Sequence, residues 1–353
     1  MGMNESTSRD QLLSIQYLRA IAALMVVLHH ARSDRSWEFN SLEGYYAFAW
    51  GVDIFFVISG LIMYVAARNE KPLEFLKKRT IRVIPLYWCA TIAVLILNEG
   101  FVLFSSPPLD LLVHIAKSLA FIPHYNLRVS DQVWPYLIPG WTLNYEMFFY
   151  LIFFWGLISG RVFQFTSVVI IGLLAAGLVF EFSNPIMSTY TSPLLLEFLV
   201  GVWIASLYLN GKLPKYTIWL LPTGFVGLFL LPVLEGQFLE VWGRILCSSF
   251  IVAGAVSLGT KTPYIPFAKL LGDASYSIYL THTFVGLVLA RRLWNLTPVT
   301  GWPQFIGWGV LSLCVSMAAG VLVYLYFEKP LLKWLRGILL PIADHRSSLV
   351  KST

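Results

Sequence analysis

The chain has 353 residues and a formal net charge of +6, and 57% of its residues are hydrophobic while only 12% are charged. A soluble domain usually carries about 25% charged residues, so this composition excludes both a water-soluble globular domain and intrinsic disorder. No basic soluble module is present to bind phosphates of nucleic acid; we expect no nucleic acid partner and a polytopic helical membrane protein.

Apolar segments follow one another along the chain from residue 17 to residue 326. The segment at 109–123 is short for a crossing of about 20 residues and contains His114 and Lys117, so we interpret it as re-entrant or interfacial. The remaining segments predict an all-α transmembrane helical bundle of about ten spans, at 17–32, 48–67, 83–98, 143–159, 163–181, 193–209, 216–233, 241–259, 272–290 and 303–326.

The basic residues predict the orientation of this bundle. With the N-terminus in the cytoplasm, 18 of the 25 Lys and Arg residues fall on the inner side and seven on the outer side, as the positive-inside rule requires. An even number of spans then places both termini in the cytoplasm. We expect a cytoplasmic N-terminal tail at 1–16, a single membrane domain at 17–335 and a cytoplasmic C-terminal tail at 336–353.

Neither a metal site nor a cleaved leader is expected. The three cysteines, Cys89, Cys247 and Cys314, lie far apart in apolar runs and form no CxxC motif, so zinc and redox motifs are absent. The first apolar run ends in two histidines rather than in a small-residue cleavage site, which argues against a signal peptide.

The first span places ionisable groups at membrane depth. Only nine apolar residues separate Arg19 from His29, which is less than half of the hydrocarbon thickness at about 1.5 Å per residue. Arg19 and His30 lie on one helix face, and groups at such depth usually line a functional path. A snorkelling Arg19 and a histidine pair at the outer surface are the alternative.

Two carboxylates begin later spans on the outer side. Asp53 lies at a depth similar to that of His30, where it can orient an imidazole or satisfy free N–H groups at the helix start. Glu146 shares a helix face with Thr142 and Tyr150, and it either interacts with the helix dipole or adds a second carboxylate to an outer cavity.

Two arginines stand three residues apart at the cytoplasmic mouth of the third span. Because i and i+3 positions share a face, Arg79 and Arg82 can grip a phosphate or pyrophosphate bidentately. The alternative is that the basic run at 77–82 is only the positive-inside signal.

A polar stripe crosses an otherwise apolar late segment. Ser275, Tyr279 and His282 follow i, i+4, i+7 spacing, and such a stripe either lines a cavity or bonds to a neighbouring helix. The absence of a Gly-x-Ser-x-Gly elbow argues against a serine hydrolase.

Taken in order, these segments resemble acyltransferase family 3 of integral membrane acyltransferases, over about residues 13–335. Residues 15–20, IQYLRA, look most like the exopolysaccharide-production acetyltransferases of bacteria. The soluble esterase-like domain that some relatives carry is not expected here. The matching pieces are 18–24 (LRAIAAL) with His30, 51–60 (GVDIFFVISG), 79–85 (RTIRVIP), Trp141–Leu143 with Glu146 and Tyr150, 272–282 (GDASYSIYLTH) and 328–330 (EKP).

The resemblance implies a multi-pass O-acyltransferase of the bacterial cytoplasmic (inner) membrane. It would move an acetyl or short acyl group from cytoplasmic acyl-CoA, with acetyl-CoA as donor substrate and no permanently bound cofactor. The acceptor would be a hydroxyl of a surface or exopolysaccharide glycan or of its lipid-linked precursor, with polysaccharide-synthesis machinery as a partner.

The resemblance also implies roles for individual residues. Arg19, Arg79 and Arg82 would bind acyl-CoA, and His30 would act as general base or carry the acyl group. The predicted catalytic set is His30, Asp53 and Glu146, and the predicted substrate cavity contains Trp141, Ser275, Tyr279 and His282. Two rival functions remain at this point: a glycolipid or polysaccharide-precursor transporter or flippase without acyl transfer, and a scaffold in a polysaccharide-synthesis complex.

Overall fold

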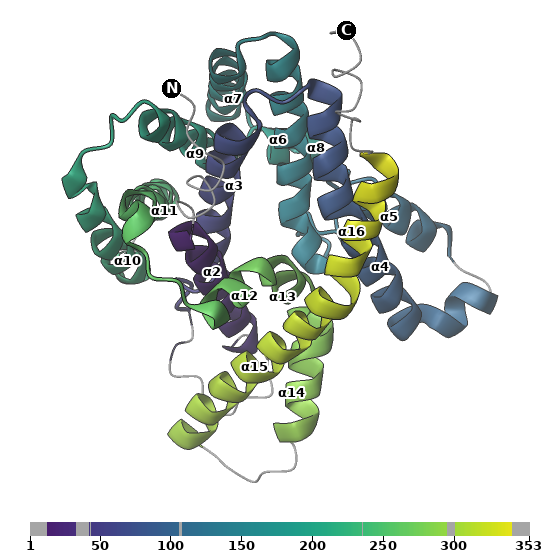
Figure 1. Cartoon of the computed structure of the whole chain (residues 1–353). Helices are drawn as coiled ribbons and strands as arrows, with labels where there is room; N and C mark the ends of the chain where they lie inside the picture. The colour runs from purple at the N-terminus through teal and green to yellow at the C-terminus, as the bar shows by residue number, and fades with distance from the viewer. Residues whose placement is uncertain are drawn as a thin grey trace, which may run out of the picture.

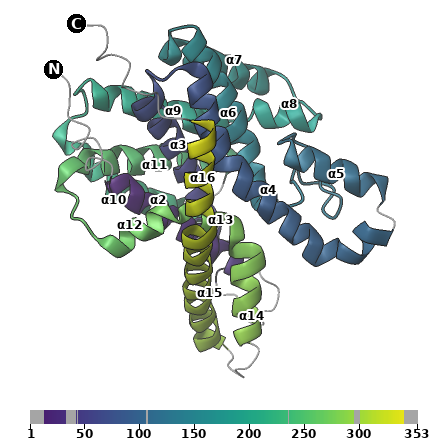
Figure 2. The same ribbon diagram turned by 45° about the vertical axis from the view of Figure 1, so that its right-hand side comes forward.

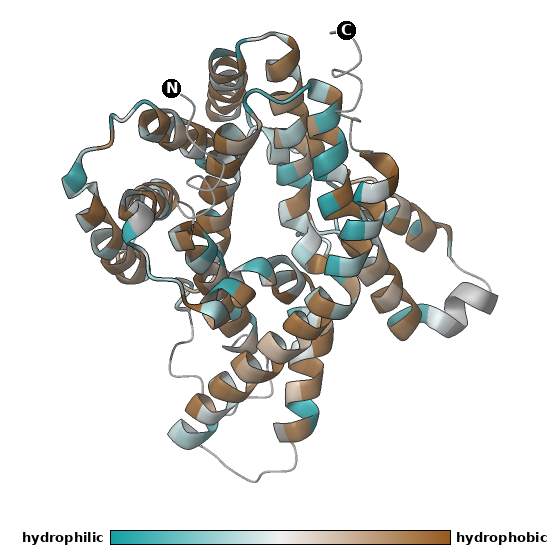
Figure 3. Cartoon of the chain, viewed as in Figure 1, coloured by the Kyte–Doolittle hydropathy of each residue, from teal (hydrophilic) through white to brown (hydrophobic). Residues whose placement is uncertain are grey.

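The computed structural model describes residues 13–32, 42, 44–105, 108–234, 236–294 and 301–340. Within these ranges every regular element is a helix, so the predicted all-α class is confirmed. Figure 3 shows hydrophobic colour along most of the helices. Many large apolar side chains are exposed, among them Leu97, Val168, Val226 and Phe238. An apolar exterior of this kind matches a lipid environment, in which every backbone polar group must be satisfied within its own helix.

The α-helices are α2 (Leu13–Arg32), α3 (Gly51–Ala67), α4 (Pro72–Ser105), α5 (Leu109–Leu119), α6 (Trp141–Ile158), α7 (Val162–Val179), α8 (Pro185–Tyr190), α9 (Leu194–Leu209), α10 (Leu220–Leu230), α11 (Gln237–Leu258), α12 (Pro266–Asp273), α13 (Ser275–Thr281), α14 (Leu287–Trp294), α15 (Gly301–Val323) and α16 (Lys329–Leu339). Short 3-10 helices are η1 (Ile138–Gly140), η2 (Lys215–Trp219), η3 (Leu231–Val233) and η4 (Gly259–Lys261), and π-helical segments are η5 (His282–Gly286) and η6 (Tyr324–Glu328).

The chain is a multi-pass membrane protein. Among the described residues, seven helical segments are long and apolar enough to cross a bilayer, and α3 is apolar but shorter. The prediction of ten spans with both termini in the cytoplasm stays a prediction. The seven segments are Leu13–Ala31, Pro72–Gly100, Val162–Val179, Pro185–Leu209, Lys215–Val233, Phe238–Leu258 and Gly301–Leu339.

The short segment interpreted as re-entrant or interfacial forms α5, which has only 11 residues. That length is too short for a crossing. The buried face of α5 is held in place by a contact between His114 Nδ1 and His124 Nε2 at 2.8 Å. Its opposite face exposes Leu109, Leu112 and Val113, which is the arrangement expected of a helix at a membrane interface.

Several predicted boundaries differ from the structure. The span predicted at 83–98 lies within the longer α4, and the span predicted at 216–233 is divided into η2, α10 and η3. The predicted span at 272–290 is not one regular helix, because α12 ends at Asp273, α13 begins at Ser275 and η5 follows it. Helix α2 already begins at Leu13, and α16 continues to Leu339, so helix occupies part of each predicted tail. The rest of the predicted tails, 1–12 and 341–353, lies outside the described residues.

Helix α3 lies between α2, α9 and α11 and packs most extensively against α9. Two glycines allow this close approach. A Cβ on Gly60 would lie 1.9 Å from the carbonyl oxygen of Phe198, and one on Gly201 would lie 2.1 Å from that of Val57. Small residues at helix interfaces commonly let membrane helices pack this tightly.

The C-terminal helices form a long continuous rod. Figure 2 shows α16 running directly on from α15, with α14 alongside α15, and Figure 1 shows α16 crossing beside α4. Helix α13 packs against α15, α2 and α4. As a result, residues from the start of the chain and from the late polar stripe meet in the interior.

Candidate functional site

A cavity of about 220 Å³ lies between α2, α3, α4, α6 and α13. Helix α3 supplies an apolar wall whose members recur at helical spacing, and the other helices supply most of the polar side chains. Its lining residues are Gln16, Arg19, Val52, Phe55, Phe56, Ile58, Ser59, Ile62, Met63, Arg79, Arg82, Val83, Thr142, Leu143, Glu146, Tyr150, Ser275, Tyr276 and Tyr279.

Three guanidinium groups face this cavity, Arg19 from α2 and Arg79 and Arg82 from α4. Arg19 Nη1 lies 3.3 Å from the Gln16 amide oxygen, and the Arg79 guanidinium lies 5.5 Å from the ring centre of Phe75. Within the described part of the chain, none of the three arginines has a carboxylate within ion-pair distance. The Nε of Arg79 is buried without a hydrogen-bond partner there. The cavity lining thus contains three guanidinium groups and one carboxylate, that of Glu146, and carries an excess of positive charge.

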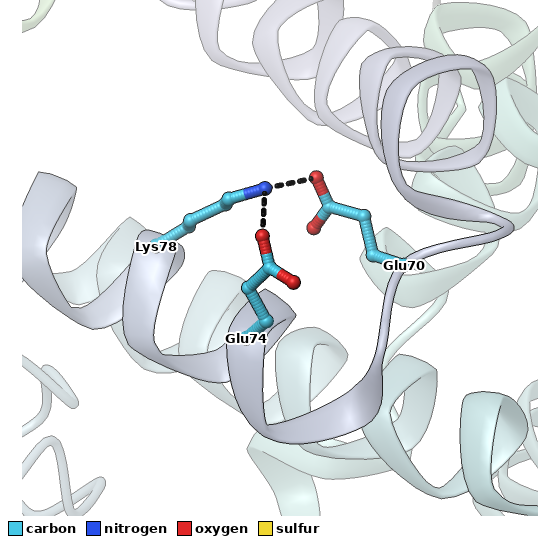
Figure 4. Close-up of polar contacts among 3 residues, drawn as sticks. All are labelled: Glu70, Glu74 and Lys78. Carbon is cyan, nitrogen blue, oxygen red and sulfur yellow. Dashed lines mark hydrogen bonds and ion pairs between the residues drawn. The ribbon is translucent and has the colours of Figure 1, made fainter. Parts of the chain in front are cut away.

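The neighbouring lysine is neutralised by the protein itself. Lys78 Nζ lies 2.9 Å from Glu70 Oε1 and 2.8 Å from Glu74 Oε1, as Figure 4 shows. Lys78 does not line the cavity. The basic run at 77–82 thus contains a lysine that is paired with two glutamates and two arginines that face the cavity.

A set of hydroxyl groups joins α6 to α13 at the cavity wall. Glu146, the acidic side chain of the lining, accepts a hydrogen bond from the Tyr150 hydroxyl. Thr142 Oγ1 lies 3.0 Å from the Tyr279 hydroxyl, and both lie within 3.1 Å of the Pro139 carbonyl oxygen. The predicted shared face of Thr142, Glu146 and Tyr150 is confirmed by their common position in the lining.

Beyond this wall lies a pair of histidines. His282 is fully buried, and its Nε2 lies 3.1 Å from His30 Nδ1. The same His30 nitrogen lies 3.0 Å from the Val26 carbonyl oxygen, and His282 Nδ1 lies 2.6 Å from the Tyr279 carbonyl oxygen. Imidazoles in this arrangement can hold and move a proton.

Helix α13 and the start of η5 connect the cavity to the histidine pair. Ser275 and Tyr279 line the cavity, while His282 contacts His30 on α2. The Tyr276 hydroxyl donates to the Val83 carbonyl at 2.8 Å and ties α13 to α4. The polar stripe thus does both things that the sequence left open: it lines a cavity and it bonds to a neighbouring helix.

Asp53 is placed elsewhere. Its neighbours Val52 and Phe55 line the cavity, whereas its own carboxylate lies 3.2 Å from Arg244 Nε on α11. The fully buried Glu197 of α9 interacts electrostatically with both groups. No hydrogen bond joins Asp53 to His30 in the part of the chain that the structure describes.

Trp141 is also outside the cavity lining. Its ring packs against Phe56, at 6.4 Å between ring centres, and against Tyr145, at 5.9 Å. Trp141 therefore contacts Phe56, which lines the cavity, without lining the cavity itself.

Several polar residues at or near the site were not among the site residues predicted from the sequence. Gln16 contacts Arg19, and the buried Glu328 accepts a hydrogen bond from Ser277. Glu197 and Arg244 are isolated charges in apolar runs, a signal that the sequence does contain. Gln16 carries no such signal, because it stands at the polar edge of the first span.

Known proteins show similarity across most of the chain. The family profile described as an acyltransferase domain matches residues 12–324. The exopolysaccharide production protein ExoZ of Rhizobium meliloti (strain 1021) is 37% identical over 293 residues, which cover 81% of this chain and 90% of that protein. BcsY of Komagataeibacter xylinus, a membrane-bound transacylase by name, is 29% identical over 165 residues, covering 43% of this chain and 38% of that protein. No solved structure matches the chain.

Proposed function

The chain belongs to acyltransferase family 3, and from this premise we propose that it is an O-acyltransferase of exopolysaccharide synthesis. It takes an acetyl or other short acyl group from acyl-CoA at the cytoplasmic side of the bacterial inner membrane. The acceptor is a hydroxyl of a surface or exopolysaccharide glycan or of its lipid-linked precursor. The printed name of ExoZ, which links that relative to exopolysaccharide production, supports this acceptor class.

The proposal that acyl-CoA is the acyl donor rests on one observation. Three guanidinium groups without ion-pair partners among the described residues face one cavity, and an apolar wall stands beside them. Phosphate groups suit such forks because charge-assisted bidentate hydrogen bonds are strong and directional. The apolar wall suits the less polar arm of coenzyme A.

The spacing along α2 favours a long ligand over a compact anion. Arg19 and His30 are eleven residues apart on one helix, which corresponds to about 16 Å along its axis. A molecule anchored at Arg19 must be narrow and extended to bring a reacting group near His30. The phosphopantetheine arm with its terminal thioester has this shape.

In the proposed reaction His30 acts as general base. Its Nε2 accepts the proton of the acceptor hydroxyl while that oxygen attacks the thioester carbonyl carbon. The tetrahedral intermediate collapses as the C–S bond breaks, and the departing thiolate takes the proton back from His30. The ester and free CoA thiol are the products. An acyl-histidine route would use the same nitrogen as nucleophile and would leave an acylated His30 detectable by mass spectrometry of the intact protein.

The deciding experiment compares surface polysaccharide from cells carrying His30→Ala, His29→Ala or the wild-type chain. Mass spectrometry of the polymer should show loss of the acyl group in His30→Ala, with polymer export intact, and normal acylation in the matched His29→Ala control. Full acylation by a membrane-inserted His30→Ala protein would exclude the catalytic role. Loss of the whole polymer would instead support a transporter or flippase.

A further inference from the structure

His282 and His30 meet from opposite ends of the chain, 252 positions apart. Their ring centres are 4.8 Å apart, and the His282 ring is fully buried while His30 is half-buried. The ring nitrogens of a buried imidazole normally have hydrogen-bond partners. Here both ring nitrogens of His282 have one, at Tyr279 and at His30.

The contacts fix which nitrogen of each ring carries hydrogen. A carbonyl oxygen can only accept, so His282 Nδ1, 2.6 Å from the Tyr279 carbonyl oxygen, is the N–H. In a neutral imidazole the other nitrogen is then an acceptor. His282 Nε2 therefore accepts from His30 Nδ1, which carries hydrogen and also lies 3.0 Å from the Val26 carbonyl oxygen.

This leaves the lone pair of His30 on Nε2. We propose that His282 is the positioning residue of His30: together with the Val26 carbonyl it holds the Nδ1–H tautomer, which makes Nε2 the basic nitrogen, and it stabilises the imidazolium that forms when Nε2 takes a proton. The hydrogen-bond chain runs from His30 through His282 to the Tyr279 carbonyl, whose dipole complements the positive charge. This inference rests on the proposed function, because it takes His30 as the base.

The local backbone is built to hold His282 in this position. His282 opens the π-helical segment η5, and π-helical turns are rare and frequently occur at functional sites. Gly286 closes the segment directly against α15, because a Cβ there would lie 2.2 Å from the Ser316 hydroxyl oxygen. The segment is thus packed between α13 and α15, and the ring of His282 is kept on the side of α2.

The test uses the full-length protein with the substitutions His282→Phe, His282→Gln and His282→Asn. Phe keeps the ring shape but offers no acceptor to His30. Gln reaches the position of Nε2, where its amide oxygen can accept from His30 Nδ1. Asn keeps a polar contact with Tyr279 but is too short for His30. Thr281→Val is the matched control, since the Thr281 hydroxyl donates to the Ser277 carbonyl of its own helix and has no other hydrogen bond among the described residues.

The first readout is release of CoA thiol from acetyl-CoA in membrane vesicles of cells that make the polysaccharide. We expect kcat to fall about 100-fold in the Phe and Asn variants, with the KM for acetyl-CoA unchanged. The Gln variant should recover much of the rate, and Thr281→Val should match the wild type. A purely structural role would instead make Gln and Asn equivalent, and that outcome would overturn the inference, as would full activity in the Phe variant.

The second readout reports the tautomer without relying on activity. Nitrogen NMR of ¹⁵N-histidine-labelled protein, with the His30 signals identified by their loss in His30→Ala, should show Nδ1–H in the wild type and Gln variant. In the Phe variant Nδ1–H loses His282 and keeps the Val26 carbonyl as acceptor, so the Nδ1–H fraction should fall and the Nε2–H fraction should rise. An unchanged His30 tautomer in His282→Phe refutes the inference. If His30→Ala retains acyl transfer, the proposed base itself fails, and the two failures are thereby distinguished.

Discussion

At the scale of single residues, Lys78 differs from its basic neighbours Arg79 and Arg82 in whether a carboxylate of the protein offsets its charge. Lys78 is held by two glutamates at the surface, so its charge is already neutralised and partly screened by solvent. Arg79 and Arg82 face the cavity with no ion-pair partner among the described residues. An anion bound in the cavity would offset the positive charge of these two arginines. The attraction between opposite charges is stronger in a site shielded from water.

Neutralising the two arginines should therefore weaken binding of CoA. We expect Arg79→Ala and Arg82→Ala each to raise the Kd by about 10- to 100-fold, because a hydrogen bond to a charged group contributes about 1.5–3 kcal/mol. CoA-induced thermal shift of the purified protein in detergent measures the change. Lys78→Ala is the control and should bind as the wild type does; unchanged binding in both arginine variants would refute the phosphate site.

The position of a side chain could be predicted from the sequence when its neighbours lie on the same helix, but not when they lie on another helix. Arg79 and Arg82, three positions apart, were predicted to share a face, and they do. Asp53 was predicted to act near His30, yet it pairs with Arg244 on a different helix. Helical periodicity determines which residues share a face, but the neighbour that a face meets is decided by packing between helices far apart in the sequence.

At the scale of helices, the position of the cavity depends on how closely α3 approaches α9. Phe56 lines the cavity from α3 and stacks on Phe198 of α9, with ring centres 4.6 Å apart. Gly60, one turn further along α3, lies against the Phe198 backbone. A wider separation of these helices would displace the apolar wall of the site.

Adding a single methyl group at Gly60 should force this separation. Because the new Cβ would lie 1.9 Å from a backbone carbonyl oxygen, Gly60→Ala should destabilise the protein by about 1–3 kcal/mol, seen as a lower melting temperature in detergent. Gly172→Ala on α7 is the matched control, since no atom of the described residues lies within 4 Å of its Cβ position, and it should be neutral or slightly stabilising. Equal melting temperatures for the two variants would contradict this role of Gly60.

The apolar runs of the sequence predict where helices occur, but they do not predict breaks or π-helical turns within them. The run at 272–290 predicts one helix, but the structure breaks it after α12 and inserts the π-helical segment η5. Hydropathy does not distinguish α from π geometry, because both satisfy the backbone internally. Gly286 at the end of η5 packs tightly against α15, a tertiary contact that hydropathy does not reveal.

At the scale of the whole molecule, the length of the C-terminal helical rod helps to predict how the protein is oriented in the membrane. The rod from Gly301 to Leu339 has 39 residues, or about 58 Å, nearly twice the hydrocarbon thickness. One end must therefore leave the membrane, and α16 carries Lys329, Lys333 and Arg336. Helix α16 packs beside α4, whose basic run at 77–82 begins near its N-terminal end. Two basic helix ends at one face favour the cytoplasmic side for both.

Reporter fusions test this orientation directly. Alkaline phosphatase is active only after export, and green fluorescent protein exported by the general secretion route does not fluoresce. A fusion after residue 340 should therefore fluoresce and show no phosphatase activity, because the predicted orientation places the end of α16 in the cytoplasm. A fusion after residue 130, between α5 and α6, should give the opposite result. Arg128 of this loop pairs with Glu99 near the C-terminal end of α4, whereas Arg79 and Arg82 lie near its N-terminal end. Phosphatase activity at residue 340 would reverse the assignment and, with it, the side from which acyl-CoA reaches Arg79 and Arg82.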